Sequence, residues 1–509
     1  MPFEFLATEL LFDAFEYLSS MDLFHAFNGL NARFDSLLID FFRTKKQIDF
    51  RYAWKEDLTL IRRRYFPSFI DQIQSIYLSD NDTSPHGIDF FLSRLYPLHR
   101  FENLTCISLE NISSFDKCLR ILDDLQPMAC LTTLYLKQCS FRADFKLIVS
   151  LIDKVWTLAH LTHCYLDMTW TSHSHFTPPT IISCSIESLI IRGVQCLASN
   201  LPLLYDHTPH LSYLSVDIWD PYNDSMSLFS PMITLTTFRM QCQDSSVSLA
   251  SLFRPMSQLK RLIFESDTMR MDGHEWEILL SRSLPQLRDF ELKTQIDLST
   301  RPDTDMEIDR MIDSYRTRFW IDDHRWFIRC YWNRDSDDHI LRLHTVPSHF
   351  DHFVLNLDEN FVMKSTCPDD SPSHVHYDYV TRLTCSSSGF NQAHPTLNIC
   401  FPHLRSLTLT LPRIHSFHAL VPRLDNLTSL KVRMSNGFEY DNDDHGDGGD
   451  DLSQLQDILD QSSRLVTLIF QSWAAPSIKS ERSQRKVSQQ VEVVALTSLS
   501  EDSTSRSLM

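Results

Sequence analysis

Histidine pairs are the residues of this 509-residue chain best suited by type and spacing to hold a metal ion. Residues 173–175 and 374–376 are His-x-His segments, which could place two imidazoles on one face of a strand. No cysteine or carboxylate completes a ligand set at a fixed spacing, so we interpret both pairs as exposed loop histidines. His274-Glu275 lacks the second histidine that a zinc-binding helix requires. The sequence therefore predicts no metal site and no cofactor.

Other catalytic signatures are missing from the sequence. It contains no G-x-S-x-G, no P-loop and no G-x-G-x-x-G, and its nine glycines make a phosphate-cradling loop improbable. The acidic loop 441–451 lacks the D-x-D-x-D-G order and the closing glutamate of a calcium loop, so we interpret it as a disordered insertion. We expect no catalytic residues and predict that the protein is not an enzyme.

The overall charge and the apolar runs exclude several classes of partner. With 66 acidic and 47 basic residues the net charge is −19, which argues against a nucleic-acid-binding protein. No run reaches the 18 apolar residues needed to cross a membrane, and residues 1–11 carry two acids and no base, unlike a secretory signal. The twelve cysteines include no C-x-x-C pair. We expect a cytoplasmic or nuclear protein that binds neither nucleic acid nor membrane.

A short pattern, L-x-x-L-x-L, organises the chain after residue 70. Clear copies begin at Leu104, Leu131, Leu211, Leu259 and Leu404, and degenerate copies at Ile73, Leu161, Ile186, Leu235, Leu287, Phe350, Val380, Leu427 and Leu465. From Ile73 to Leu287 the copies are 24 to 31 residues apart, and helical spacing follows several of them. This recurrence resembles leucine-rich repeats. We therefore expect an α/β fold, an irregular leucine-rich-repeat solenoid with parallel strands on its concave face and helices and loops on its convex face.

Such a solenoid would present the residues that flank the last two apolar positions of each copy, because strand side chains alternate. Mixed charges with interleaved tyrosines on such a face favour protein recognition. The target-binding residues predicted in this way are Tyr135, Lys137, His163, Tyr165, Tyr213, Asp217, Arg261, Glu265 and Glu291.

The step from Leu287 to Phe350 is longer than two repeats and contains Trp320, Trp326 and Trp332. Alternating residues predict a strand over 326–332 and a returning strand over 341–345. One hypothesis is an exposed aromatic binding site. The other, which we favour, is a hairpin that joins or caps two parts of the array and buries its tryptophans.

The first forty-five residues follow a different pattern, with apolar residues at the spacing of three short helices. Thr8 is placed to cap the first helix. The run 5–12, the pairs Tyr17-Leu18 and Asp22-Leu23, and Arg33-Phe34 near its close resemble an F-box. Ala7 stands where that family usually has proline, and Phe34 where it usually has tryptophan.

The resemblance implies a function for the whole chain. F-boxes dock on a Skp-type adaptor that tethers them to the cullin scaffold of a ubiquitin ligase. The residues that would bind the adaptor here are Phe5, Leu6, Leu10, Leu11, Phe15, Tyr17, Leu18, Leu23 and Phe24. The repeats would then bind a target protein that the sequence leaves unidentified. The alternative is a ligase-independent leucine-rich-repeat scaffold whose first helices only cap the array.

These patterns divide the chain into six predicted segments. The segments are an F-box-like helical domain (1–45), a linker helix and cap (46–70), the first part of the array (71–297), the aromatic-rich insertion (298–349), the second part of the array with the acidic loop 441–451 (350–475), and a disordered tail (476–509).

Overall fold

A computed structural model of the chain describes its helices, strands and many of the loops between them. The described residues are 3–81, 87–92, 98–142, 144–170, 175–219, 231–242, 248–298, 304–333, 340–346, 350–357, 361–368, 377–387, 400–411, 421, 423–434, 455–456, 458–462, 464–465, 467–471 and 492–496. The acidic loop 441–451 lies outside this set, as do His173, His374 and His376.

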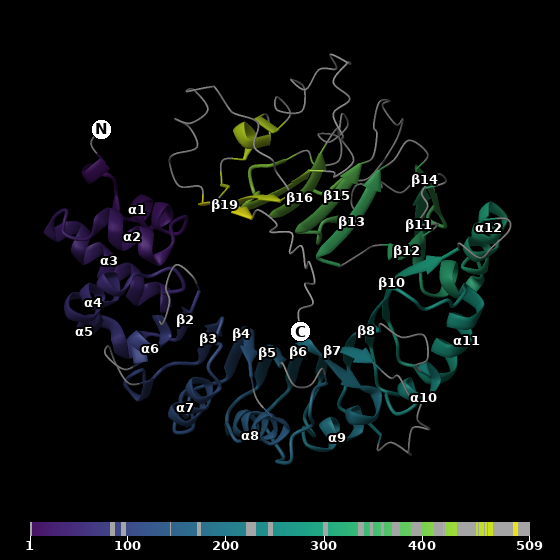
Figure 1. Cartoon of the computed structure of the whole chain (residues 1–509), viewed down its shortest axis with the longest axis horizontal. Coiled ribbons are helices and arrows are strands. Elements are labelled where there is room, and N and C mark those ends of the chain that lie inside the picture. The colour runs from purple at the N-terminus through teal and green to yellow at the C-terminus, as the bar shows by residue number, and fades with distance from the viewer. Residues whose placement is uncertain are drawn as a thin grey trace, which may run out of the picture. The chain divides into compact units, whose positions relative to one another are not determined.

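The chain is an α/β protein with helices at its N-terminus and a large, mostly parallel sheet of sequential strands (Figure 1). It divides into two compact units. Unit 1 contains Met1–Met269 and Ile278–Phe290, and unit 2 contains Arg270–Glu277 and Glu291–Met509. The division passes through α11 (Gly273–Ser283) and β10 (Asp289–Asp297).

Unit 1 begins with helices and continues with strands that alternate with further helices. Its helices are η1 (Phe3–Phe5), α1 (Thr8–Phe15), α2 (Ser20–Phe27), α3 (Ala32–Lys45), α4 (Lys55–Arg64), α5 (Phe66–Phe69), η2 (Ile70–Gln72), α6 (Gly87–Phe90), η4 (Leu98–Arg100), α7 (Phe115–Leu125), α8 (Phe145–Trp156), η5 (Ala198–Asn200), α9 (Leu201–Asp206) and α10 (Leu249–Phe253). Its strands are β1 (Gln47–Asp49), β2 (Ser75–Ser79), β3 (Cys106–Glu110), β4 (Thr133–Phe141), β5 (His163–Trp170), β6 (Ser188–Leu197), β7 (Tyr213–Trp219), β8 (Thr237–Cys242) and β9 (Arg261–Ser266).

Side-chain caps start two of the three N-terminal helices. Ser19 accepts from the backbone N–H of Asp22 at the start of α2, and Asn31 accepts from that of Phe34 at the start of α3. The predicted cap at Thr8 is wrong. Helix α1 begins at Thr8 itself, and Ala7 is its N-cap, with extended backbone and no side-chain hydrogen bond.

Every copy of the L-x-x-L-x-L pattern leads into a strand that starts two residues after the copy begins. Strands β1 to β9 pair with their sequence neighbours in order, and all of these pairs are parallel. The parallel pairing starts in the same way at each strand, through the backbone carbonyl of the residue before it. The carbonyl of Thr105, for example, accepts hydrogen bonds from the N–H groups of both Thr132 and Thr133 at 2.9 Å. The carbonyl of Thr132 likewise accepts from the N–H groups of Thr162 and His163 at the start of β5.

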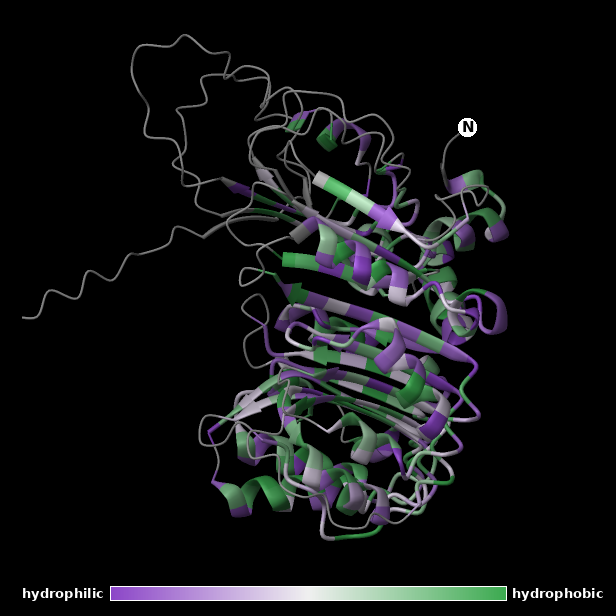
Figure 2. Cartoon of the chain, turned by 90° about the vertical axis from the view of Figure 1, so that its right-hand side faces the viewer, coloured by the Kyte–Doolittle hydropathy of each residue, from purple (hydrophilic) through white to green (hydrophobic). Residues whose placement is uncertain are grey.

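The core of unit 1 lies between its strands and the helices that follow them. Leu134 and Leu136 of β4 are buried, as are Leu151 and Val155 of α8. The helices expected after the strands are present as α7, α8 and α11. Figure 1 shows α7, α8 and α9 along the outer side of the row of strands in this unit. Figure 2 shows hydrophobic and hydrophilic residues alternating along the strands. The second face of the strands in unit 1 is therefore mostly polar, with Ile190 and Ile263 as apolar members.

Unit 2 contains two sheets. In the first, the order is β10, β12 (Ile340–Val346), β11 (Phe327–Asn333) and β14 (Phe361–Ser365), and all of these pairs are antiparallel. Helix α12 (Thr304–Ser314) and a π-helical turn, η6 (Phe319–Asp323), precede the hairpin of β11 and β12. Trp320, Trp326 and Trp332 are all buried. The hypothesis of an exposed aromatic site is therefore wrong.

The second sheet of unit 2 is parallel throughout and repeats the pattern of unit 1. Its order is β13 (His352–Leu357), β15 (Arg382–Ser387), β16 (Ser406–Leu411), β17 (Ser429–Met434), β18 (Thr467–Gln471) and β19 (Glu492–Leu496). The carbonyl of Thr381 again accepts from two N–H groups, those of Arg405 and Ser406. Strand β19 lies within the predicted disordered tail 476–509. For these five residues that prediction is wrong, because the valine-rich segment pairs with β18.

Candidate interaction surfaces

The nine predicted adaptor-binding residues fall into two groups. Four side chains are exposed, with Phe5 68%, Leu10 55%, Tyr17 75% and Leu18 37% accessible, and Leu6 is half-buried. The other four are buried in the core of unit 1: Leu11, Phe15, Leu23 and Phe24. A side chain that the unit itself buries has no surface to offer a partner, so the structure limits this prediction to the exposed group.

The buried group joins the N-terminal helices to the linker helices α4 and α5. The ring of Phe24 stacks on that of Phe42, with centroids 4.8 Å apart, and Phe42 stacks on Phe69 at 5.8 Å. Phe24 also contacts Tyr65, whose hydroxyl donates to Asn28 or Asp35, at 2.6 and 2.9 Å. The three helices therefore share one aromatic core with residues 46–70.

The exposed group lies on the helical turns around α1. The guanidinium of Arg33, in α3, donates to the carbonyls of Glu4 and Leu6 and so fixes the short turn η1. Phe5 lies between these two carbonyls and remains exposed. Four large side chains, Phe5, Leu10, Tyr17 and Leu18, are thus exposed within residues 5–18, and exposed apolar side chains that gather in one place often mark an interaction site.

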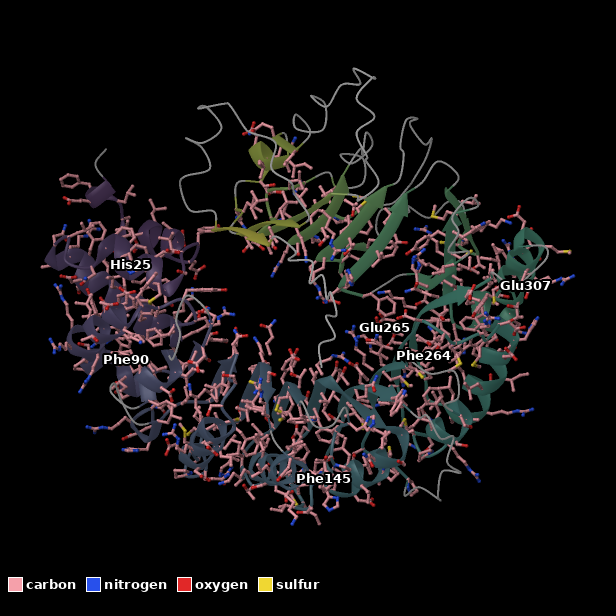
Figure 3. All side chains as sticks on the ribbon, viewed as in Figure 1. His25, Phe90, Phe145, Phe264, Glu265 and Glu307 are labelled. Atoms are coloured by element: carbon pink, nitrogen blue, oxygen red, sulfur yellow. The ribbon has the colours of Figure 1, made fainter. Side chains whose placement is uncertain are left out.

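The second candidate surface is the largely polar face of β1 to β9 in unit 1, together with Arg51 just after β1, and we call it the sheet face. Its residues are cross-strand neighbours by register. Tyr77, Ser108, Tyr135 and Tyr165 form one row across β2 to β5. The rings of Tyr135 and Tyr165 have centroids 5.9 Å apart. In Figure 3, Glu265 of β9 lies on this inner side, Phe264 lies toward the helices, and Phe145 of α8 lies on the outer side.

Opposite charges are paired along the sheet face. Arg51 contacts Asp49 at 2.6 Å and Glu110 at 3.4 Å, and Lys137 contacts Glu110 at 3.2 Å. Further along the same face, Arg239 contacts Glu265 at 2.7 Å. All these side chains are half-buried, so each pair fixes the position of groups that still reach solvent. A surface of positioned charges beside tyrosine rings is suited to recognising a protein.

A bulge in β6 places one further ion pair on the sheet face. Gly193 adopts φ +78°, and a Cβ there would lie 2.5 Å from the carbonyl oxygen of Met168, so a glycine is required. The register between β6 and β7 shifts across this bulge. Arg192 contacts Asp217 and donates to the hydroxyl of Ser215 at 2.9 Å. Burial nevertheless raises the pKa of Asp217 above its ordinary value.

Burial raises the pKa of several groups on the sheet face. Cys106, at the start of β3, lies on this face, and burial raises the pKa of its thiol. A thiol with a raised pKa is a weak nucleophile at neutral pH. Burial likewise raises the pKa of Tyr77 and of Tyr135, which keeps both phenols protonated. The arrangement is suited to binding.

Eight of the nine predicted target-binding residues lie on the sheet face. His163 is exposed and the others are half-buried: Tyr135, Lys137, Tyr165, Tyr213, Asp217, Arg261 and Glu265. The prediction is wrong for Glu291, because this residue is only 4% accessible. In unit 2 the same side of β10 is covered by the following chain, where Lys293 donates to the carbonyl of His352 and lies over the ring of Phe350.

The prediction from sequence missed several members of this face. Tyr77, Glu110, Arg192 and Arg239 flank the apolar positions of other copies, so the same rule would have found them. Arg51 follows β1, which carries no copy of the pattern, and no signal in the sequence indicated it.

Neither a comparison with protein-family models nor one with curated proteins finds a match for this chain. Among the described residues, no helix is long and apolar enough to cross a membrane. Within the same residues, no three histidine, cysteine, aspartate or glutamate side chains lie together as a metal site would require. His175, from the first His-x-His segment, stacks on Trp219 with ring centroids 4.6 Å apart.

Proposed function

We propose that this protein is the substrate-recognition subunit of a cullin–RING ubiquitin ligase of the Skp–cullin–F-box type. The N-terminal helices would act as an F-box that binds a Skp-type adaptor, and the strands would form an irregular leucine-rich-repeat array that binds the target on the sheet face. Catalysis would lie in the partner subunits. Tethering the target raises its effective concentration at the ubiquitin-conjugating enzyme.

The observation that carries the adaptor part is the exposure of Phe5, Leu10 and Tyr17 on a helical unit whose inner residues are well packed. These side chains are not needed for the internal core, since Leu11, Phe15 and Phe24 supply it. An exposed apolar set beside a rigid core is what a docking site for a partner's groove requires. The sheet face, with paired charges and tyrosines, supports the target-binding part.

The shared aromatic core of Phe24, Phe42, Tyr65 and Phe69 favours a second candidate function. In this alternative, the chain is a ligase-independent scaffold and its first helices only cap the array. A cap accounts for the buried residues of the helical unit. It gives no reason for the exposed ones.

Removing residues 1–45 is a poor test of these alternatives, because the deletion would expose Tyr65 and Phe69 and destabilise unit 1. The sharper test is a double substitution, Leu10→Asp with Tyr17→Asp, at two exposed positions. We expect the full-length variant to fold normally and to bind a purified Skp-type adaptor at least about tenfold more weakly, as hot-spot residues do.

The matched control is Leu203→Asp with Ile233→Asp, which adds the same two charges at exposed apolar residues of the same unit. The control should bind the adaptor like the unmodified chain. If the double variant also binds like the unmodified chain, or if the folded unmodified chain binds no adaptor, the ligase proposal is wrong and the scaffold alternative stands.

A further inference from the structure

Three basic residues lie side by side on one face of the antiparallel sheet in unit 2. By register, His344 of β12 is the direct neighbour of Lys293 on β10 and of Arg329 on β11. We call these three residues the basic row.

The basic row is covered, unlike the sheet face of unit 1. Arg329 is 5% accessible and His344 is 3% accessible. Tyr377, fully buried, closes over them with its hydroxyl 2.7 Å from Nε2 of His344 and 3.2 Å from a terminal nitrogen of Arg329. Because a guanidinium can only donate, the tyrosine oxygen accepts from Arg329, which leaves its O–H to donate to a neutral His344.

The charge of Arg329 has no counter-ion among the described residues. Its Nε is buried and makes no hydrogen bond, and no carboxylate of the described chain forms an ion pair with it. Glu291, on the same strand as Lys293 and also buried, is not an ion-pair partner of Arg329. A buried guanidinium with unused donors is costly, and an anion is the group that would use them.

We propose that the basic row is a binding site for a small oxyanion of the phosphate type, held by the guanidinium of Arg329 with help from Tyr377, His344 and Lys293. The planar guanidinium can donate two parallel hydrogen bonds to two oxygens of such an anion. His344 and the tyrosine hydroxyl can reorient toward a third oxygen. The burial of Arg329, His344 and Tyr377 favours a free anion over one carried on a large partner. The proposal does not depend on the ligase function.

The test is thermal unfolding of the full-length protein in increasing inorganic phosphate, against chloride at matched ionic strength. A ligand that binds only the folded state raises the midpoint temperature in a concentration-dependent way that follows its dissociation constant. We expect a saturable rise with phosphate that chloride does not reproduce. Arg329→Leu should abolish the saturable part, while Arg382→Leu, at an exposed arginine of the same unit, should keep it.

A second variant protects the test against a folding defect in Arg329→Leu. Tyr377→Phe removes one hydroxyl with little change in volume and should weaken phosphate binding by roughly tenfold. An equal rise in chloride, or an undiminished saturable rise in either Arg329→Leu or Tyr377→Phe, would overturn the proposal, because phosphate would then act by screening or by exclusion from the protein surface.

Discussion

In both units, the alternation of side chains along the strands sets which residues lie on the face opposite the core. That face is largely open to solvent in unit 1 and covered in unit 2. In unit 1, most side chains opposite the core still reach solvent, although Ser108, Ser215 and Ile263 are buried. Arg51, Lys137 and Arg239 each meet a carboxylate there. In unit 2, the corresponding face of β10, β12 and β11 is covered, and Arg329 meets a histidine and a tyrosine instead. The alternation of a strand decides which side chains share a face. The chain that packs on that face decides whether these side chains stay accessible to a partner or are buried.

The largest predicted difference is in the free energy of unfolding, between substitutions on the two faces of a single strand in unit 1. Leu136 of β4 is fully buried, and its neighbour Tyr135 lies on the sheet face. We expect Leu136→Ala to reduce the free energy of unfolding by about 2–5 kcal/mol through the cavity that it leaves. Tyr135→Ala should cost about 1 kcal/mol or less. Urea denaturation of both variants measures the difference, and similar losses would contradict the assignment of faces.

A smaller effect should distinguish the covered face by its response to pH. Burial, together with the positive charges of Arg329 and Lys293, lowers the pKa of His344 from 6.5 to about 3. Protonation therefore favours the unfolded chain, so stability is fully present above pH 6.5 and is lost as the pH falls toward 3. Tyr331 and Tyr377 also pack against this imidazole, and burial keeps both phenols protonated over this range.

The corresponding experiment compares the unmodified chain with His344→Gln in phosphate-free buffer. Between pH 7 and pH 5 the unmodified chain should lose about 2 kcal/mol more unfolding free energy than the variant. The same comparison with the exposed His163→Gln, on the sheet face, provides the control. An identical pH dependence of the His344→Gln variant and the unmodified chain would show that His344 is not held in its neutral form.

The smallest effect concerns the ion pairs of the sheet face. A double-mutant cycle on Arg239 and Glu265, each changed to alanine, should give a coupling of about 0.5–1 kcal/mol, since half-buried pairs gain little over their hydration. Added salt should reduce this coupling. A coupling of several kcal/mol would mean that this face is structural and less free to bind a partner.

The sequence predicted the recurring strands well and the details of both surfaces less completely. Periodicity identified the strands because the apolar residue at each copy, such as Leu131 or Leu404, is needed to fill the same layer of the core. In the first helix, however, Leu10 and Leu11 are adjacent and equally apolar, and only packing against α3 decides that Leu11 is buried and Leu10 exposed. The basic row joins residues 293, 329 and 344, whose pairing depends on an antiparallel order that the sequence did not specify.

The most direct test of the account is side-chain footprinting of the full-length protein with and without a saturating Skp-type adaptor. Hydroxyl-radical modification reports how accessible each aromatic side chain is. The account predicts that the adaptor protects Phe5 and Tyr17 and leaves Tyr135 and Tyr165 unchanged, because the adaptor and the target would use different surfaces. Unchanged modification of Tyr17, or protection of Tyr135 in its place, would contradict it.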